Sequence, residues 1–352
     1  MRPILPTFDM VSKYLIKMDG NQVYSNFGPL SFELEERYAK FFGVIPEKVV
    51  LCSSATMGLM GAVSTSTSNN IVAPAFTFAA SIQAIVNTGK KCIFEDINPV
   101  TMELALTRST IDSNTSFLYV LPFGTGVNLS KFNAKSEFII DAAASIHAFE
   151  GNLDKLQEKH LIAFSLHATK VLGIGEGGVV VFGDIERAKV FRSWLNFGFS
   201  TERISITYGL NGKLSEVNAA YGLAALDNWE NEKKEWKEAR DLANLNIPEN
   251  NIVKDISVKS FANPYYNICI NNTVALDQFK KLLSDNNIPN RKWWPDGCHR
   301  MPAFQSFNNK DLPVTDKLAK NIIGLPFYRK IKEKNYSKLK DVINILLNSK
   351  FE

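Results

Sequence analysis

The sequence predicts an α/β fold: a mostly parallel central sheet with helices on both faces, followed by a small C-terminal α+β domain. The 352 residues suit two domains. Short, almost wholly apolar segments alternate with segments of helical spacing, which is typical of parallel strands buried on both faces. The composition then turns polar over residues 237–251. We place the boundary there, between a large domain (1–240) and a small one (241–352).

The elements follow in order along the chain. Residues 31–42 carry apolar side chains at helical spacing, and Ser54 precedes a helix of small residues as an N-cap. We expect further helices at 57–65, 79–88, 185–195, 215–236, 274–286 and 336–348. We expect strands at 48–52, 70–72, 92–94, 117–121, 137–140, 161–164, 179–182 and 265–270.

Composition and charge exclude several classes of protein. The net charge of +4 is spread along the chain, unlike the basic groove of a nucleic-acid-binding protein. No apolar stretch approaches the ~18 residues of a membrane span. The four cysteines form no Cys-x-x-Cys or Cys/His cluster. We therefore expect no metal site and a reducing, cytoplasmic compartment.

A glycine cluster tests one cofactor class. Gly173, Gly175 and Gly178 satisfy G-x-G-x-x-G, but a dinucleotide-binding fingerprint needs a strand before it and a helix after it. Here an apolar strand follows, at residues 179–182. We interpret the glycines as a turn with positive φ before a buried strand, which argues against a nicotinamide-dependent dehydrogenase.

Polar side chains gather at the predicted carboxyl ends of the strands, where ligands bind to parallel sheets. Lys170 could form a Schiff base, Asp141 could pair with a protonated ring nitrogen, residues 54–56 offer amides to an anion, and Phe78 could stack on a ring. These are the parts that pyridoxal phosphate requires. Each has an ordinary alternative: a surface lysine, simple helix caps, and a core phenylalanine.

The segment FSLHATKVLGIGEGGVVV (164–181) is similar to the lysine segment of the DegT/DnrJ/EryC1/StrS family of sugar aminotransferases. SNFGPLSFELEERYAKFFGV (25–44) resembles the N-terminal segment of that family, and NIIGLPFY (321–328) resembles its C-terminal signature. LCSSATMGLMGA, IVAPAFTFAAS, CIFEDINPVTMEL, IIDAAAS and YGLNGKLSEVNAAYGLAAL follow in family order. The resemblance implies a pyridoxal-phosphate-dependent transferase of fold type I, which acts as a homodimer with shared active sites.

The resemblance also implies a role for each matching residue. Lys170 carries the cofactor and later moves the proton between the substrate carbon and the cofactor, while Asp141 holds the proton of the pyridinium nitrogen. The implied cofactor-binding set is Ser54, Ala55, Thr56, Phe78, Asp141, Ser165, Lys170, Asn211 and Lys213, of which the last two reach the phosphate in a neighbouring subunit. Two positions depart from the family pattern: Ala55 replaces a frequent glycine, and Ala144 replaces a polar side chain near the ring.

A loop rich in cations and aromatic side chains, RKWWPDGCHR (291–300), suits a sugar nucleotide. The cations match a diphosphate, and the tryptophans could stack on a base or sugar or anchor the loop. We predict substrate contacts from His167, Arg291, Trp293 and His299. For His167, a bond to the local backbone is the alternative.

We therefore predict an aminotransferase that moves an amino group from glutamate to a keto-deoxysugar nucleotide through pyridoxamine phosphate. NFG (196–198) and GLNGKLSE (209–216) most resemble members that aminate C4 of dTDP-4-keto-6-deoxyglucose for surface-glycan (O-antigen) synthesis. Three alternatives stay open: a sugar 3-aminotransferase, a dehydratase of the same family, and a catalytically silent regulatory homologue. The lysine at position 170 argues against the dehydratase.

Overall fold

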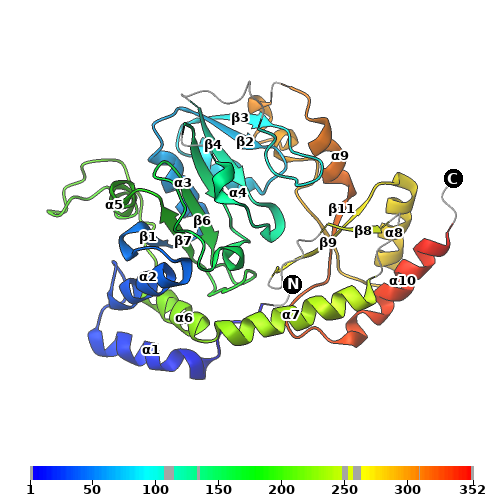
Figure 1. Cartoon of the computed structure of the whole chain (residues 1–352), viewed down its shortest axis with the longest axis horizontal. Coiled ribbons are helices and arrows are strands. Elements are labelled where there is room, and N and C mark those ends of the chain that lie inside the picture. The colour runs from blue at the N-terminus through cyan, green and yellow to red at the C-terminus, as the bar shows by residue number, and fades with distance from the viewer. Residues whose placement is uncertain are drawn as a thin grey trace.

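The computed structural model describes residues 3–106, 115–132, 135–247, 253–256, 263–308 and 310–349. In these ranges the chain forms a seven-stranded sheet and a four-stranded sheet. The two sheets lie side by side, and a long helix runs along one edge of the molecule from one to the other (Figure 1). The predicted α/β fold class is confirmed.

The larger sheet has the strand order β1-β7-β6-β5-β4-β2-β3. β7 runs antiparallel to its neighbours β6 and β1, and every other pair is parallel. The predicted strands are all present, with ends shifted by at most two residues. Their bounds are β1 (Val49–Cys52), β2 (Asn70–Pro74), β3 (Lys91–Glu95), β4 (Thr115–Val120), β5 (Glu137–Asp141), β6 (Leu161–Ser165) and β7 (Gly178–Phe182).

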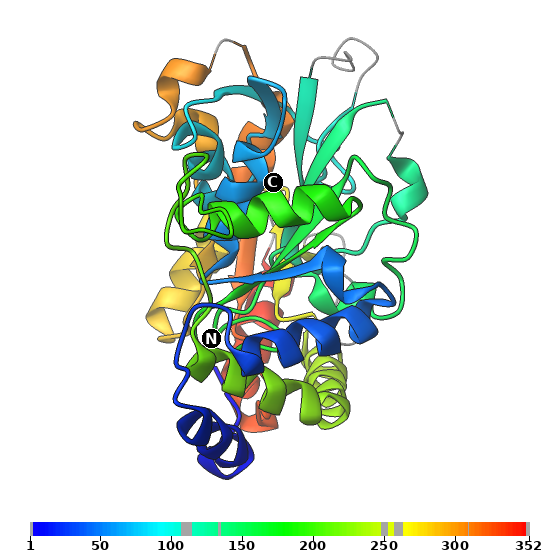
Figure 2. The same cartoon turned by 90° about the vertical axis from the view of Figure 1, so that its left-hand side faces the viewer.

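Alternate residues of each strand face two separate hydrophobic cores, because successive side chains of a strand point to opposite faces. In β1, Val49 and Leu51 join the core under α1, α2 and α6, whereas Val50 and Cys52 join the core under α3, α4 and α5. Figure 2 shows β1 between α5 above and α2 below. The bounds of these helices are α1 (Phe8–Asn21), α2 (Pro29–Phe42), α3 (Ala55–Ser64), α4 (Ala79–Val86), α5 (Ile185–Trp194) and α6 (Glu216–Asp227).

The helix predicted over 215–236 is in fact two helices. α6 ends before Asn228, whose amide bonds back to the last turn of that helix, and α7 (Trp229–Asn246) begins after it. α7 runs through most of the polar stretch that the composition marks as a domain boundary, and residues 248–251 of that stretch lie outside the described residues. The stretch is polar because α7 buries only one stripe of its surface. The division at residue 240 falls inside this helix and stays a prediction.

The smaller sheet is antiparallel throughout, in the order β10-β11-β9-β8. Its strands are β8 (Val253–Asp255), β9 (Tyr266–Ile270), β10 (Arg291–Lys292) and β11 (Ile322–Leu325). The helices around it are α8 (Thr273–Asp285), α9 (Pro313–Asn321) and α10 (Ser337–Asn348). The strand predicted at 265–270 and the helices predicted at 274–286 and 336–348 are present, each with ends within one residue.

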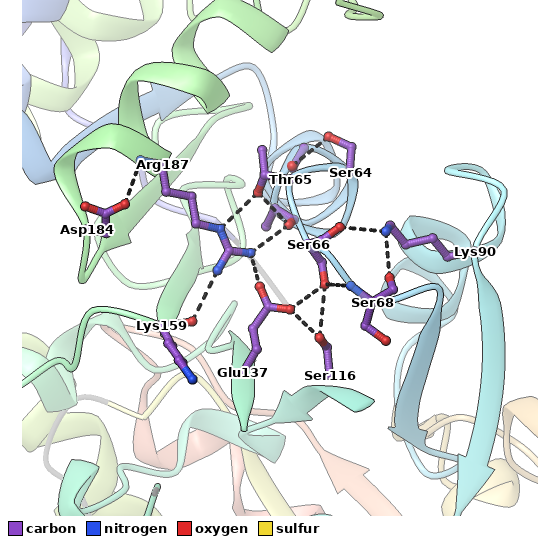
Figure 3. A network of polar contacts seen from close by, with 12 residues as sticks. Ser64, Thr65, Ser66, Ser68, Lys90, Ser116, Glu137, Lys159, Asp184 and Arg187 are labelled. Atoms are coloured by element: carbon purple, nitrogen blue, oxygen red, sulfur yellow. Dashed lines mark hydrogen bonds and ion pairs between the residues drawn. The ribbon is translucent and has the colours of Figure 1, made fainter. Parts of the chain in front are cut away.

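A partly buried ionic network fixes the C-terminal end of α3 to the amino ends of the central strands (Figure 3). The Glu137 carboxylate at the start of β5 accepts hydrogen bonds from the hydroxyls of Ser66 and Ser116, and pairs with the guanidinium of Arg187. Arg187 also donates to the Thr65 hydroxyl at 3.1 Å, just after the last turn of α3. The network therefore holds this helix at the end opposite to its N-terminus.

The described residues also bear on three expectations from the sequence, namely those about membrane spans, cysteines and metal ligands. Within the described ranges, no helix is long and apolar enough to cross a membrane. The four cysteines are buried free thiols. Among the residues that the structure describes, no three His, Cys, Asp or Glu side chains gather as ligands for a metal ion.

Candidate active site

A cavity of about 680 Å³ opens at the carboxyl ends of the central strands, and residues from the segments beside β9 and β10 line its other side. Asp141 and Ser165, the last residues of β5 and β6, both line it. Most of the predicted site residues line this one cavity, namely Ser54, Ala55, Thr56, Phe78, Asp141, Ser165, His167, Lys170, Arg291 and Trp293.

Lys170 lies in the loop that joins the antiparallel strands β6 and β7. Two backbone hydrogen bonds hold this loop closed, from the Leu166 amide to the Gly177 carbonyl (2.9 Å) and from the Ala168 amide to the Gly175 carbonyl (2.8 Å). Gly175 has a φ of +108°, so the predicted positive φ is confirmed at this glycine, whereas Gly173 and Gly178 do not have a positive φ. The loop thus presents the lysine amine to the cavity from a fixed backbone.

Asp141 is buried, with 6% of its surface exposed. Its Oδ2 accepts a hydrogen bond from the Ser81 hydroxyl at 2.6 Å, and its Oδ1 accepts one from the Ala143 amide at 3.1 Å. Burial raises the pKa of the Asp141 carboxyl above its ordinary value, although these bonds and the positive charge of Lys170 act in the opposite direction. A cation placed against this carboxylate would favour its charged form. The carboxylate is therefore suited to a protonated ring nitrogen.

The start of α3 is a cup of backbone amides. Ser54 is the N-cap, and its hydroxyl accepts a hydrogen bond from the Met57 amide at 3.1 Å. The amides of the first turn, those of Ala55 and Thr56 among them, have no acceptor inside the helix and can bind an anion. Gly178 of β7 permits this arrangement, because a Cβ there would lie 2.7 Å from the backbone of Ser54.

The Ala55 departure from the family pattern is compatible with this cup. Ala55 is the first residue of α3 and is not among the residues with positive φ. A methyl group is therefore tolerated at this position without backbone strain.

His167 and Phe78 both line the cavity, but they differ in their contacts with the rest of the chain. The His167 ring lies 2.8 Å from the Thr169 hydroxyl and 3.7 Å from a carboxylate oxygen of Glu176. The Thr169 amide also donates to Nδ1 of this ring at 3.2 Å, so the expected alternative of a bond to the local backbone is present, and His167 still lines the cavity. Phe78 precedes α4 and is 62% exposed, so its ring is available to a ligand.

The loop around β10 forms an aromatic wall. Trp294 stacks on Phe123 with ring centroids 4.8 Å apart and an interplanar angle of 5°. Trp293 donates from its indole nitrogen to the Asn267 side-chain oxygen at 2.7 Å. The Arg291 guanidinium lies 5.0 Å from the centroid of the Trp293 ring and remains exposed. The tryptophans therefore anchor the loop, and the exposed cations Arg291 and Lys292 line the cavity, where they can meet an anionic ligand.

Three predicted residues do not line the cavity. Asn211 and Lys213 bond to each other at 2.7 Å near the end of the loop between α5 and α6. His299 is 1% exposed, and its Nε2 lies 3.1 Å from an Asp316 carboxylate oxygen. Burial lowers the pKa of His299 below its ordinary value, with Asp316 acting in the opposite direction. The ring packs edge-on against Phe94 of β3, with centroids 6.3 Å apart, and does not line the cavity, so nothing in this position supports the predicted substrate contact of His299.

No sequence motif marks Tyr265 or Ser81, yet each contacts a predicted catalytic residue. Tyr265 immediately precedes β9, and its hydroxyl accepts a hydrogen bond from the Lys170 amine. Ser81 lies in the first turn of α4 and bonds to Asp141. The only available signal is that Ser81 closely follows a predicted strand end, whereas Tyr265 is far from the lysine in the sequence and meets it through the tertiary fold.

The donor groups of this cavity fit pyridoxal phosphate. An amine, a buried carboxylate and unpartnered amides match its aldehyde, ring nitrogen and phosphate. The fit extends to the backbone, because Gly178 keeps the cup beside α3 free of a side chain that would displace the helix. One wall is less polar than the resemblance implies, since Ala144 lines the cavity with only a methyl group.

Comparisons with known proteins point to the same chemistry. A model of the DegT/DnrJ/EryC1/StrS aminotransferase family matches residues 9–346. The chain is similar to the dTDP-4-amino-4,6-dideoxy-D-glucose transaminase of Shigella dysenteriae, with 27% identity over 357 residues and 94% of each chain covered.

The fold of this chain is also similar to the folds of solved aminotransferase structures. The structure of DesI in the presence of its TDP-sugar product is 25% identical to this chain, with a TM-score of 0.85, and the match covers 98% of this chain and 91% of DesI. The structure of NtdA from Bacillus subtilis with bound cofactor PMP is 19% identical, with a TM-score of 0.84, and the match covers 97% of this chain and 82% of NtdA. At that identity the second likeness concerns the fold alone.

Proposed function

We propose, on the premise that this chain belongs to the DegT/DnrJ/EryC1/StrS aminotransferase family, that it transfers an amino group from glutamate to a nucleotide-linked keto sugar with pyridoxal phosphate as cofactor. The observation that carries this proposal is that Lys170, Asp141 and the start of α3 line one cavity. The amine, the carboxylate and the amides are the contacts that this cofactor needs.

Each part of the cofactor has a candidate partner. Lys170 would hold the aldehyde carbon covalently, Asp141 would face the ring nitrogen, and the amides of Ala55 and Thr56 with the Ser165 hydroxyl would hold the phosphate. When bound, the cofactor supplies a carbon that accepts an amino group and a ring that withdraws electrons. The exposed ring of Phe78 would cover one face of it.

Lys170 and Asp141 then divide the acid–base work. The Lys170 amine, once released from the cofactor, would take the proton from the donor carbon and pass it to the cofactor in the same half-reaction, and in the second half it would move a proton from the cofactor to the acceptor carbon. Asp141 keeps the proton on the ring nitrogen, because a buried carboxylate stabilises an adjacent cation strongly. The two residues approach from neighbouring strands, so they can act on one ligand at the same time.

The substrate proposal rests on the relatives and on the loop around β10. The Shigella dysenteriae relative acts on a dTDP-linked 4-amino-4,6-dideoxyglucose, and DesI carries a TDP-sugar product, as their names state. We propose dTDP-4-keto-6-deoxyglucose as acceptor, aminated at C4, with a product that enters surface-glycan (O-antigen) synthesis. Arg291 is the exposed cation that would meet the diphosphate.

A homodimer with shared sites is part of the same proposal. The loop between α5 and α6 extends away from the rest of the chain (Figure 1). It exposes five large apolar side chains, a feature typical of interaction surfaces: Phe197, Ile204, Ile206, Tyr208 and Leu210. We propose that a second copy covers this loop and that Asn211 and Lys213, near its end, reach the phosphate of that copy. The free thiols suit the cytoplasm as the compartment.

Product analysis tests the proposed function. We expect the purified protein, with pyridoxal phosphate, glutamate and dTDP-4-keto-6-deoxyglucose, to form the C4 amino sugar and an equal amount of 2-oxoglutarate. An amino group at C3 would identify a 3-aminotransferase, and loss of a hydroxyl without amination would identify a dehydratase. A protein that neither binds the cofactor nor forms product would be a silent homologue, which refutes the proposal.

A further inference from the structure

The Lys170 amine has a partner that comes from the other sheet. We propose that Tyr265 is a positioning residue for this lysine: its hydroxyl holds Nζ in the cavity whenever the amine is not joined to the cofactor. The inference rests on the proposed function in one respect, namely that Lys170 carries pyridoxal phosphate. It adds a residue that no sequence motif marks and a link between the two sheets.

The contact between the two side chains is direct. Lys170 donates a hydrogen bond to the Tyr265 hydroxyl, and its Nζ lies 5.2 Å from the centroid of the tyrosine ring. Tyr265 is 6% exposed, whereas Lys170 is half-buried and borders the cavity. The amine is thus bonded to a side chain that is more deeply buried than the lysine itself.

Tyr265 can hold the amine because its own position is fixed at four points. Arg240 of α7 donates to the Tyr265 carbonyl at 2.6 Å, and the Tyr265 amide donates to the Asn263 side-chain oxygen at 2.9 Å. The ring packs edge-on against Phe123 and Trp293, with centroids 6.2 and 5.0 Å apart. Backbone and ring are therefore both immobilised before the hydroxyl meets the lysine.

A flexible lysine needs such a partner to react quickly. Its four-carbon stem samples many conformations, and only those with Nζ near the aldehyde carbon lead to attachment. The hydrogen bonds of the Asp141 carboxylate go to Ser81 and to the Ala143 amide, and the bond of the Lys170 amine goes to Tyr265. Residue 144 on the same wall is alanine and has no polar side-chain atom.

The bond also couples the two sheets. Tyr265 lies directly before β9 of the four-stranded sheet, and Lys170 lies between β6 and β7 of the seven-stranded sheet. The amine is therefore presented correctly only when the two parts of the fold are correctly packed. The covalent step itself is a simple condensation, in which the Lys170 nitrogen joins the aldehyde carbon and one water leaves.

The test compares the covalent attachment of pyridoxal phosphate to Lys170 with the non-covalent binding of pyridoxamine phosphate. Cofactor-free wild-type protein and Tyr265→Phe are mixed with pyridoxal phosphate, and the absorbance of the new imine is followed. Borohydride reduction and mass spectrometry then locate the adduct on Lys170. In parallel, the affinity for pyridoxamine phosphate is measured, because this form has an amine in place of the aldehyde and cannot join the lysine.

We expect attachment in Tyr265→Phe to be roughly three- to tenfold slower, as the loss of one hydrogen bond implies. The affinity for pyridoxamine phosphate should stay within about twofold, because phenylalanine retains the ring contacts. Tyr119→Phe is the matched control. Tyr119 also accepts a hydrogen bond from a lysine, Lys131, but it lies outside the cavity lining, and both readouts should stay at wild-type values.

Two results would overturn the inference. Equal attachment rates in wild type and Tyr265→Phe would show that the hydroxyl does not position the amine. A parallel loss of affinity for pyridoxamine phosphate would show that Tyr265 only shapes the cavity. If Tyr265→Phe is unstable, Tyr265→Met repeats the test, because its flexible side chain refills the space without a hydroxyl. Failure of the wild type itself to attach the cofactor at Lys170 refutes the proposed function instead.

Discussion

Replacement of Asp141 by asparagine separates the two roles that this residue can have. As a cap, Asp141 needs only an oxygen that accepts from the Ala143 amide at 3.1 Å, and asparagine retains that oxygen. As the partner of a protonated ring, it needs a negative charge, which asparagine lacks. Asp141→Asn therefore keeps the first role and abolishes the second.

The size of the effect follows from the burial of the carboxylate. A charge partner in such a position shifts the pKa of its neighbour by ~1–3 units, and each unit is ~1.4 kcal/mol, or about tenfold. We expect the half-reaction with glutamate to slow by roughly 10- to 1,000-fold in single-turnover absorbance measurements. The unfolding free energy of the cofactor-free protein should change by no more than about 1 kcal/mol at neutral pH.

The pH dependence of stability has a definite sign. Because burial raises the pKa of Asp141 above the ordinary 3.8, the native state binds more protons than the unfolded state as pH rises from that value. Cofactor-free wild-type protein should therefore lose stability relative to Asp141→Asn as pH rises through this window. Denaturant titrations at several pH values measure the difference.

A capping aspartate outside the cavity provides the matched control. Asp96 accepts hydrogen bonds from the Val314 and Thr315 amides at 2.9 Å, at the start of α9. Asp96→Asn should leave the half-reaction unchanged. The reasoning fails if Asp141→Asn retains near-wild-type turnover, because Asp141 would then be only a cap.

Four further predictions follow from the same contacts. Lys170→Ala should form no borohydride-reducible adduct in the cavity, as mass spectrometry after reduction would show. Ser165→Ala should weaken the binding of pyridoxamine phosphate by about tenfold, the value of one hydrogen bond to a charged group, in an equilibrium titration. Arg291→Ala should raise the KM for the sugar nucleotide with little change in kcat, and an unchanged KM would place the diphosphate elsewhere. Arg187→Met leaves the Glu137 carboxylate, which is 15% exposed, without its cationic partner, so chemical denaturation should show a loss of about 3 kcal/mol, the lower end for a broken buried pair, with the affinity for pyridoxamine phosphate unchanged.

The strands and their order of appearance could be predicted because burial on both faces makes them short apolar runs. Val49–Cys52 and Leu161–Ser165 are buried at every position, so no amphipathic period complicates their recognition. The antiparallel direction of β7 could not be read from its composition, because apolar runs look alike in either direction. The length of α7 could not be predicted either, because an exposed polar helix and a polar linker have a similar composition.

Site residues could be predicted where a side chain suited to the reaction lies at or just after the end of a predicted strand. Asp141 and Ser165 end strands, and Lys170 follows five residues after Ser165, so local pattern and reaction chemistry coincide. His299 does not line the cavity, because its ring is buried beside Asp316, and the spacing of residues in a loop does not indicate such a burial. Tyr265 could not be predicted from the sequence, because its contact with the lysine spans 95 positions in the chain.

The most direct test of the account is the absorbance spectrum of the purified protein before and after addition of glutamate. The account predicts a band at the edge of the visible range, from a Schiff base at Lys170, which moves towards the ultraviolet as the cofactor takes up the amino group. A spectrum without any band, even after incubation with pyridoxal phosphate, would contradict the account. A band that does not respond to glutamate would retain the cofactor and contradict the proposed donor.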